Sequence, residues 1–128
     1  MAEITLLESK ELDAAIALDQ VASRGSAIPF RELGGPRLDC YQRHVVNRID
    51  STVEDLRWPE FCRSATAIGI HSILSYPLVF SGVGLGTLSV YSEIEAGFDG
   101  RAEQVGAVFA PLASAIVGNA AASLRRGE

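Results

Sequence analysis

The chain has 128 residues, of which 48% are hydrophobic and 21% charged, and its formal net charge is -5 at pH 7. This length fits a single domain over residues 1–128, and the apolar fraction supports a buried core and excludes disorder over most of the chain. An acidic chain lacks the clustered Lys and Arg side chains that neutralise phosphates, so we expect no nucleic-acid partner.

The first part of the chain predicts a β-hairpin. The run Glu3–Leu7 is rich in β-forming residues, and Leu12–Leu18 follows it after a short polar stretch. Three alanines in the second run suit a helix equally well, so both interpretations stay open. Residues 19–27 are mostly small and polar and are expected to form a loop. Ile28–Phe30 is expected to be a short extended piece, which Pro29 restricts to an edge or a strand start.

The middle of the chain predicts two short helices separated by a strand. Gly34–Pro36 breaks the chain and favours a helix that runs through Gln42, because proline is well tolerated in a first helical turn. Val45–Ile49 is the predicted strand. A second helix is predicted over Trp58–Ala67, and Gly69 is a suitable residue to end it.

The segment Gly69–Ser92 predicts a second hairpin, with two apolar strands around a Gly-rich turn at Gly82–Gly86. Ala65–Tyr91 lacks Asp, Glu, Lys and Arg, which is also typical of a membrane span. The Gly-rich turn, Pro77 and the repeated serines favour a buried hairpin instead, so we expect no membrane partner. The turn lacks the lysine and the following helix of a phosphate-binding loop.

A long helix is predicted over Gly100–Leu124, with Asp99 as its N-cap. Pro111 is expected to kink the helix or to split it. Arg125 and Arg126 suit the negative pole of the helix dipole. Apolar residues recur at helical spacing and are expected to pack on the sheet: Val105, Phe109, Leu112, Ile116 and Ala120.

Four local motifs carry a resemblance to a known family. They are Leu33–Asp39, Arg57–Phe61, Ser72–Leu78 and Gly86–Ser92. Together with the order of the elements, they resemble GAF domains, and most nearly the actinobacterial GAF domains that are coupled to an RNA-binding ANTAR module. The resemblance implies an α+β fold: a central antiparallel β-sheet, as in profilin and PAS domains, flanked by helices and followed by a long C-terminal helix.

Two departures from the family pattern bear on the expected partners. GAF domains usually begin with a helix that packs beside the last one, whereas the first predicted strand here starts close to Met1. No ANTAR module follows, so the RNA-binding activity is not implied. We therefore expect a lone or excerpted module that forms a homodimer through its C-terminal helix and acts on a separate output protein.

The second hairpin also predicts a candidate ligand site. If apolar residues pair with apolar residues, Leu74, Leu78, Leu88 and Val90 share one face of the sheet. The other face then carries Ile73, Ser75, Thr87, Ser89 and Tyr91. A mostly apolar surface with a few hydroxyls suits a small-molecule pocket. Its candidate roof consists of Tyr41, Trp58 and Phe61. The alternative is that all of these residues only pack beneath the helices, with Trp58 as a packing anchor.

Cysteines and histidines give no catalytic or metal-binding pattern. Cys40 and Cys62 are too far apart for a C-x-x-C motif, and no further ligands accompany His44 and His71 at a workable spacing. We expect no catalytic residue, no metal and no cofactor, and a reduced, cytoplasmic chain. A GAF-type reductase of free methionine sulfoxide uses two cysteines, but the cysteine pattern of that family is absent here.

The sequence thus predicts a non-enzymatic GAF-like regulatory or sensory module that binds a small molecule, dimerises, or does both. The alternative is a structural assembly domain without a ligand. In that reading an alanine-rich flank of the last helix meets another subunit, through Val108, Ala115 and Ala122. The methionine sulfoxide reductase is the third hypothesis.

Overall fold

A computed structural model describes residues 2–8, 11–17, 24, 28, 33–125 and 127. The predictions for the loop over 19–27 and for Ile28–Phe30 lie almost wholly outside these residues, and so does Arg126. The described elements are β1 (Ala2–Glu8), β2 (Glu11–Ala17), α3 (Gly35–Arg43), β3 (Asn47–Ile49), α4 (Pro59–Ala67), β4 (Ser72–Phe80), β5 (Val83–Ser92) and α5 (Gly100–Arg125).

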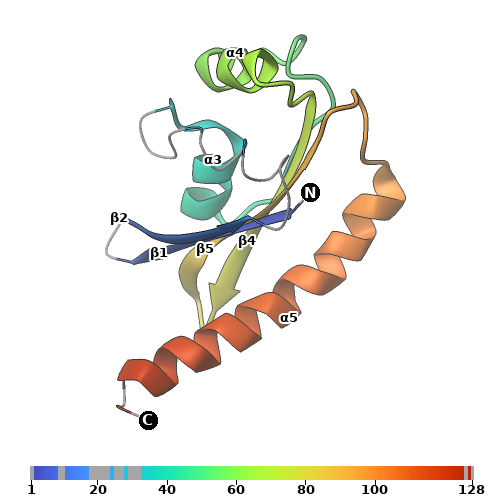
Figure 1. Ribbon diagram of the computed structural model, residues 1–128. Coiled ribbons are helices and arrows are strands. Elements are labelled where there is room, and N and C mark those ends of the chain that lie inside the picture. Colours follow the sequence, from blue (N-terminus) through green and yellow to red (C-terminus); the bar gives the residue numbers. More distant parts are fainter. Residues whose placement is uncertain are drawn as a thin grey trace.

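The strands form one antiparallel sheet in the order β2-β1-β5-β4-β3. This confirms the first hairpin, since β1 pairs with β2. The predicted strand Val45–Ile49 is shorter than expected, because pairing with β4 begins only at Asn47. Figure 1 shows α3 and α4 on one side of the sheet and α5 running along the other side. We call the side that carries α3 and α4 the inner face.

The β4–β5 hairpin turns at Ser81 and Gly82, whose φ angles are 52° and 77°. Two positive φ angles in a two-residue turn match the twist of the flanking strands. The prediction that Gly82–Gly86 forms the connection was therefore wrong, because β5 already begins at Val83. A register shift beside Leu78 takes up the extra residue within this part of the hairpin.

The two faces of the hairpin belong to two separate cores, as the alternation predicted. On the inner face, Ile73 and Tyr91 pack with Phe61 of α4. On the opposite face, Leu74 and Leu78 form the α5 core, together with the partly buried Leu88, Val90 and others. One strand pair thus supplies both hydrophobic layers, because successive side chains point to opposite faces.

Helix α5 is continuous from Gly100 to Arg125, so Pro111 does not split it. Asp99 caps the helix, since its Oδ1 accepts a hydrogen bond from the N–H of Ala102 at 2.8 Å. The residues that face the sheet are small and lie four apart: Gly106, Ala110, Ser114 and Gly118. In the described part of the chain, no helix is both long enough and apolar enough to cross a bilayer.

Close approach of the helix to the sheet explains these small residues. A Cβ at Gly106 would overlap the Tyr76 ring, and a Cβ at Gly118 would overlap the Phe80 ring. The bulky side chains of β4 therefore enter gaps on the helix surface. A larger helix residue at either position would push α5 away from the sheet.

The expected sheet-facing stripe of α5 was wrong. Its large members are exposed: Val105 by 58%, Phe109 by 62%, Leu112 by 58% and Ile116 by 71%, with Val108 beside them at 68%. The helix has apolar residues on two opposite sides, and the sheet selects the small side because only that side accommodates Tyr76 and Phe80. We call the five exposed residues the apolar ridge of α5.

Candidate functional site

A buried group of hydroxyls lies on the inner face of the sheet. Ser75 and Ser89 face each other across β4 and β5, and their Oγ atoms are 2.8 Å apart. Thr87 is fully buried on the same face, and its Oγ1 has no hydrogen-bond partner within the described part of the protein. A buried hydroxyl without a partner costs free energy, so Thr87 is the polar group here that a ligand or water would stabilise.

Helix α3 covers these hydroxyls and brings a buried arginine to the inner face. Arg37 is only 1% exposed, and its Nη2 donates to the carbonyl oxygen of Ile28 at 2.8 Å. Its guanidinium carbon lies 5.3 Å from the centroid of the Phe61 ring, within the range of a cation–π contact. Sequence reasoning missed Arg37, because a residue in the first turn of a short helix carries no sign that it is buried.

Local geometry fixes the start of α3. Gly34 and Gly35 have φ angles of 65° and 85°, which favour glycine, and a Cβ at Gly35 would lie 2.6 Å from Phe61. The Asn47 amide donates to the carbonyl of Pro36 at 3.0 Å and to Asp39 at 2.9 Å. These contacts hold α3 against β3 and against the helix α4 that carries Phe61.

The structure separates the three residues expected to form a roof. Phe61 is fully buried in the inner core, and Trp58 packs on the edge of that core, just before α4. Tyr41 lies near the other end of the hairpin, where a Cβ at Gly84 would be 3.3 Å from its ring. Phe61 and Trp58 therefore both pack in or against the inner core, whereas Tyr41 lies apart from them.

Trp58 is held by a charged loop. Asp55 accepts from Arg57 Nη2 at 2.6 Å and from the Arg57 backbone N–H at 2.9 Å, and this pairing lowers the pKa of the Asp55 carboxyl. The same guanidinium donates to the carbonyl of Arg48 at 2.7 Å and lies 4.7 Å from the Trp58 ring centroid. These contacts support the interpretation of Trp58 as a packing anchor.

The two cysteines lie in apolar surroundings. Burial raises the pKa of the Cys40 thiol to about 12 and that of Cys62 to about 11. A thiol acts as a nucleophile only as the thiolate, so both are in the unreactive form at neutral pH. Across the described residues, no three His, Cys, Asp or Glu side chains come together as metal ligands.

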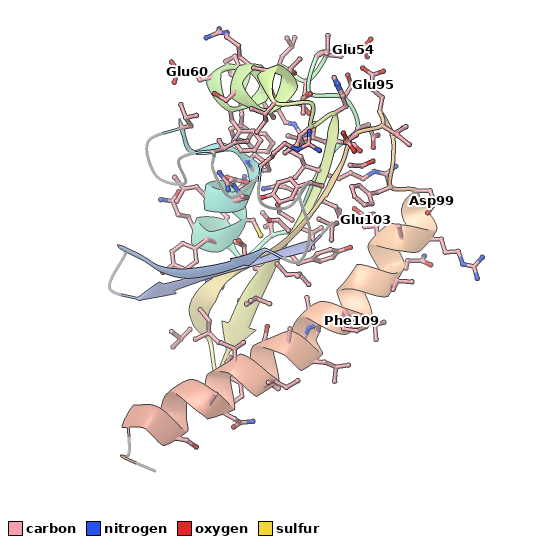
Figure 2. The ribbon with its side chains drawn as sticks, in the orientation of Figure 1. Glu54, Glu60, Glu95, Asp99, Glu103 and Phe109 are labelled. Atoms are coloured by element: carbon pink, nitrogen blue, oxygen red, sulfur yellow. The ribbon has the colours of Figure 1, made fainter. Side chains whose placement is uncertain are left out.

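A groove of about 470 Å³ lies between α4 and the loop before it. Val53, Leu56, Pro59 and Arg63 are among the residues that line it. Figure 2 shows Glu54, Glu60 and Glu95 at the end of the molecule that carries α4. This end of the molecule carries both signs of charge, since Arg63 lines the groove and Arg57 pairs with Asp55.

Comparison with solved structures identifies the fold. The chain is similar to the GAF3 domain of a Synechocystis protein in its photoproduct state, with a TM-score of 0.72 and 13% identity over 99% of this chain and 87% of that chain. It is also similar to the GAF domain of an Acinetobacter phosphoenolpyruvate-protein phosphotransferase, with a TM-score of 0.69 and 17% identity over 97% of this chain and 73% of that chain. The chain has the GAF fold.

The GAF fold occurs in a catalyst as well. A type II free methionine-R-sulfoxide reductase from Thermoplasma acidophilum aligns with a TM-score of 0.67 and 14% identity, over 92% of this chain and 78% of that chain. Sequence comparison finds no match among protein-family models and none among curated proteins. The similarity to actinobacterial GAF domains stays a prediction from the sequence.

Proposed function

We propose that this protein is a non-enzymatic GAF regulatory module that associates with a second copy of itself through the apolar ridge of α5. The observation that carries the proposal is the exposure of Val105, Val108, Phe109, Leu112 and Ile116 on one side of a helix whose other side is packed on the sheet. Apolar residues on opposite sides are typical of a helix that is buried on both sides.

The size of the ridge supports a dimer. Each of its five side chains exposes on the order of 100 Å² of apolar surface, which makes roughly 500 Å² per protomer. That equals the largest apolar patch of a typical monomer, which is often functional, and it supplies most of the roughly 800 Å² that each partner contributes to a specific interface. Figure 1 shows α5 lying along the outside of the sheet, where a second subunit would reach it.

The test is to replace Phe109 by Asp and measure the molar mass by sedimentation equilibrium. We expect the wild type to be a dimer and Phe109→Asp to dissociate at least about 100-fold more readily, because a carboxylate would be buried without a partner. The matched control is Val53→Asp, since Val53 is also 62% exposed but lies in the loop before α4. A monomeric wild type, or equal dissociation of both variants, would contradict the proposal.

A second candidate function is small-molecule binding on the inner face, and the unpaired Thr87 hydroxyl favours it. A ligand that reaches this hydroxyl would raise the melting temperature, because it binds the native state alone. We expect hits from a nucleotide and metabolite panel to lose their shift in Thr87→Val, while the free variant stays folded. If every hit keeps its full shift in Thr87→Val, this site is refuted.

Thiol catalysis is not part of the proposal. The raised pKa values of Cys40 and Cys62 support this view, as does the burial of both side chains. Free thiols also fit a reducing compartment, so we propose a cytoplasmic setting. Turnover of free methionine sulfoxide that disappears in Cys40→Ser or Cys62→Ser would overturn this part of the proposal.

A further inference from the structure

A second pocket, of about 230 Å³, lies between α5 and the edge of β4. Its walls come from Val46, Pro77 and Val79 on the sheet side, and from Ala107, Pro111 and Ser114 on the helix side. Pairing of β3 with β4 ends at Ser75, so this part of β4 lies beyond the last paired residue. The pocket is thus next to a strand edge without a β3 neighbour.

The side-chain hydroxyls and the Val79 N–H at this pocket are already used as hydrogen-bond donors. The N–H of Val79 donates to Ser114 Oγ at 3.0 Å, and the Ser114 hydroxyl donates to the carbonyl of Ala110 at 2.8 Å. Tyr76 also lines the pocket, and its hydroxyl donates to the carbonyl of Glu103 at 2.6 Å. Pro77 and Pro111 have no N–H to offer. A ligand here meets few free donors.

At the same place, two backbone carbonyls lack the partner that a regular helix or sheet would give them. In an α-helix the carbonyl of Ala107 would accept from the N–H of residue 111, and Pro111 has none. On β4, backbone groups of alternate residues point to the same edge, so the carbonyl of Pro77 faces the edge that carries the Val79 N–H. Among the lining residues there is no charged side chain.

We propose that this pocket binds a small neutral aromatic molecule of about the size of indole, with one N–H or O–H group that donates to the free backbone carbonyls. The volume is below the range of roughly 300–1,000 Å³ that suits drug-sized ligands, which favours one or two rings. The apolar walls bury the rings of the ligand, and the backbone carbonyls favour a ligand that carries a hydrogen-bond donor. This inference is independent of the proposed function, since none of the five ridge residues lines the pocket.

The first experiment titrates the full chain with indole, 1-methylindole and 3-methylindole and follows backbone NMR shifts. We expect saturable shifts at Val79 and Ala107 with indole. 1-Methylindole has lost the N–H, so it should bind about five- to tenfold more weakly, as expected for one lost hydrogen bond. 3-Methylindole is the same size as 1-methylindole but keeps the N–H, so it should bind about as tightly as indole.

Two variants and one control locate the site and the hydrogen bond. Ala107→Leu fills the pocket from an exposed helix position and should weaken indole at least about tenfold. Ala120→Leu adds the same group at an exposed position of α5 away from the pocket and should bind indole normally. Pro111→Ala restores an N–H for the Ala107 carbonyl, so the preference for indole over 1-methylindole should shrink.

Absence of saturable indole binding to the wild type would overturn the proposal. So would binding that is equally strong in Ala107→Leu, or equally strong for all three ligands. Repeating the titration with Phe109→Asp separates this result from self-association, because the variant changes the ridge and leaves every lining residue in place.

Discussion

Individual buried residues decide the chemistry of the inner face. Arg37 and Thr87 are polar and fully buried: Arg37 lies over the Phe61 ring, and Thr87 shares a sheet face with the Ser75–Ser89 pair. Cys40 is equally buried, and its thiol pKa is raised because burial disfavours the thiolate. Burial on this side of the sheet thus keeps the Cys40 thiol neutral at physiological pH.

The raised thiol pKa values predict how stability depends on pH. The ordinary value is 9.0, and Cys40 titrates at about 12 in the folded protein. Above pH 9 the unfolded chain loses this proton and the folded protein keeps it, so stability is fully present below pH 9 and falls as the pH rises toward 12. Urea unfolding between about pH 8 and pH 10 measures the free energy of unfolding. It should decline less steeply with pH in Cys40→Ala than in the wild type, by up to about 1.4 kcal/mol per pH unit. The prediction is wrong if the free energy of unfolding falls equally steeply with pH in the wild type and in Cys40→Ala.

At the scale of an element, α5 is adapted to two surfaces at once. Gly106 and Gly118 admit Tyr76 and Phe80, and Ser114 joins the helix to β4 through the N–H of Val79. The Tyr76 hydroxyl adds a second link, to the carbonyl of Glu103. Because these contacts use the small side of the helix, its large apolar residues remain on the outside.

This packing predicts an unusual effect of alanine. In an open helix, Gly→Ala stabilises by about 1 kcal/mol. In Gly118→Ala, the new methyl group would overlap Phe80, so we expect a loss of about 1–3 kcal/mol. Gly100→Ala is the control, because nothing lies within 4 Å of its Cβ position. Chemical denaturation of both variants checks the prediction, which fails if Gly118→Ala is as stable as the wild type.

At the scale of the whole molecule, the sheet separates two regions with different proposed roles. The inner face carries the buried hydroxyls beneath α3 and α4, and the other face carries α5 with its apolar ridge (Figure 1). A ligand that binds more tightly to the arrangement of the helices that the dimer also favours would shift the dimer equilibrium, and dimerisation would shift ligand affinity by the same factor.

Self-association predicts a melting temperature that rises with protein concentration. Mass action stabilises a folded dimer by about 2.7 kcal/mol for a hundredfold rise in concentration, which corresponds to several degrees for a domain of this size. Scanning calorimetry at about 5 μM and about 500 μM measures this shift. The shift should vanish in Phe109→Asp and persist in Val53→Asp. A wild-type melting temperature that is the same at both protein concentrations would argue against the dimer.

The sequence by itself determined the order of the elements and the two faces of the second hairpin. Alternation along β4 and β5 is a local property, so it correctly placed Ser75, Thr87, Ser89 and Tyr91 on one face of the sheet. The cap at Asp99 was equally readable, because capping involves only neighbouring residues.

The tertiary structure alone decided which side of α5 meets the sheet. Periodicity shows that Val105, Phe109, Leu112 and Ile116 share a face, but it does not show what that face contacts. The outcome depends on Tyr76 and Phe80, which lie far away in the sequence and need glycines opposite them. Likewise, only the fold separated Tyr41 from Trp58 and buried Arg37, because the path of α3 across the sheet is set by long-range packing.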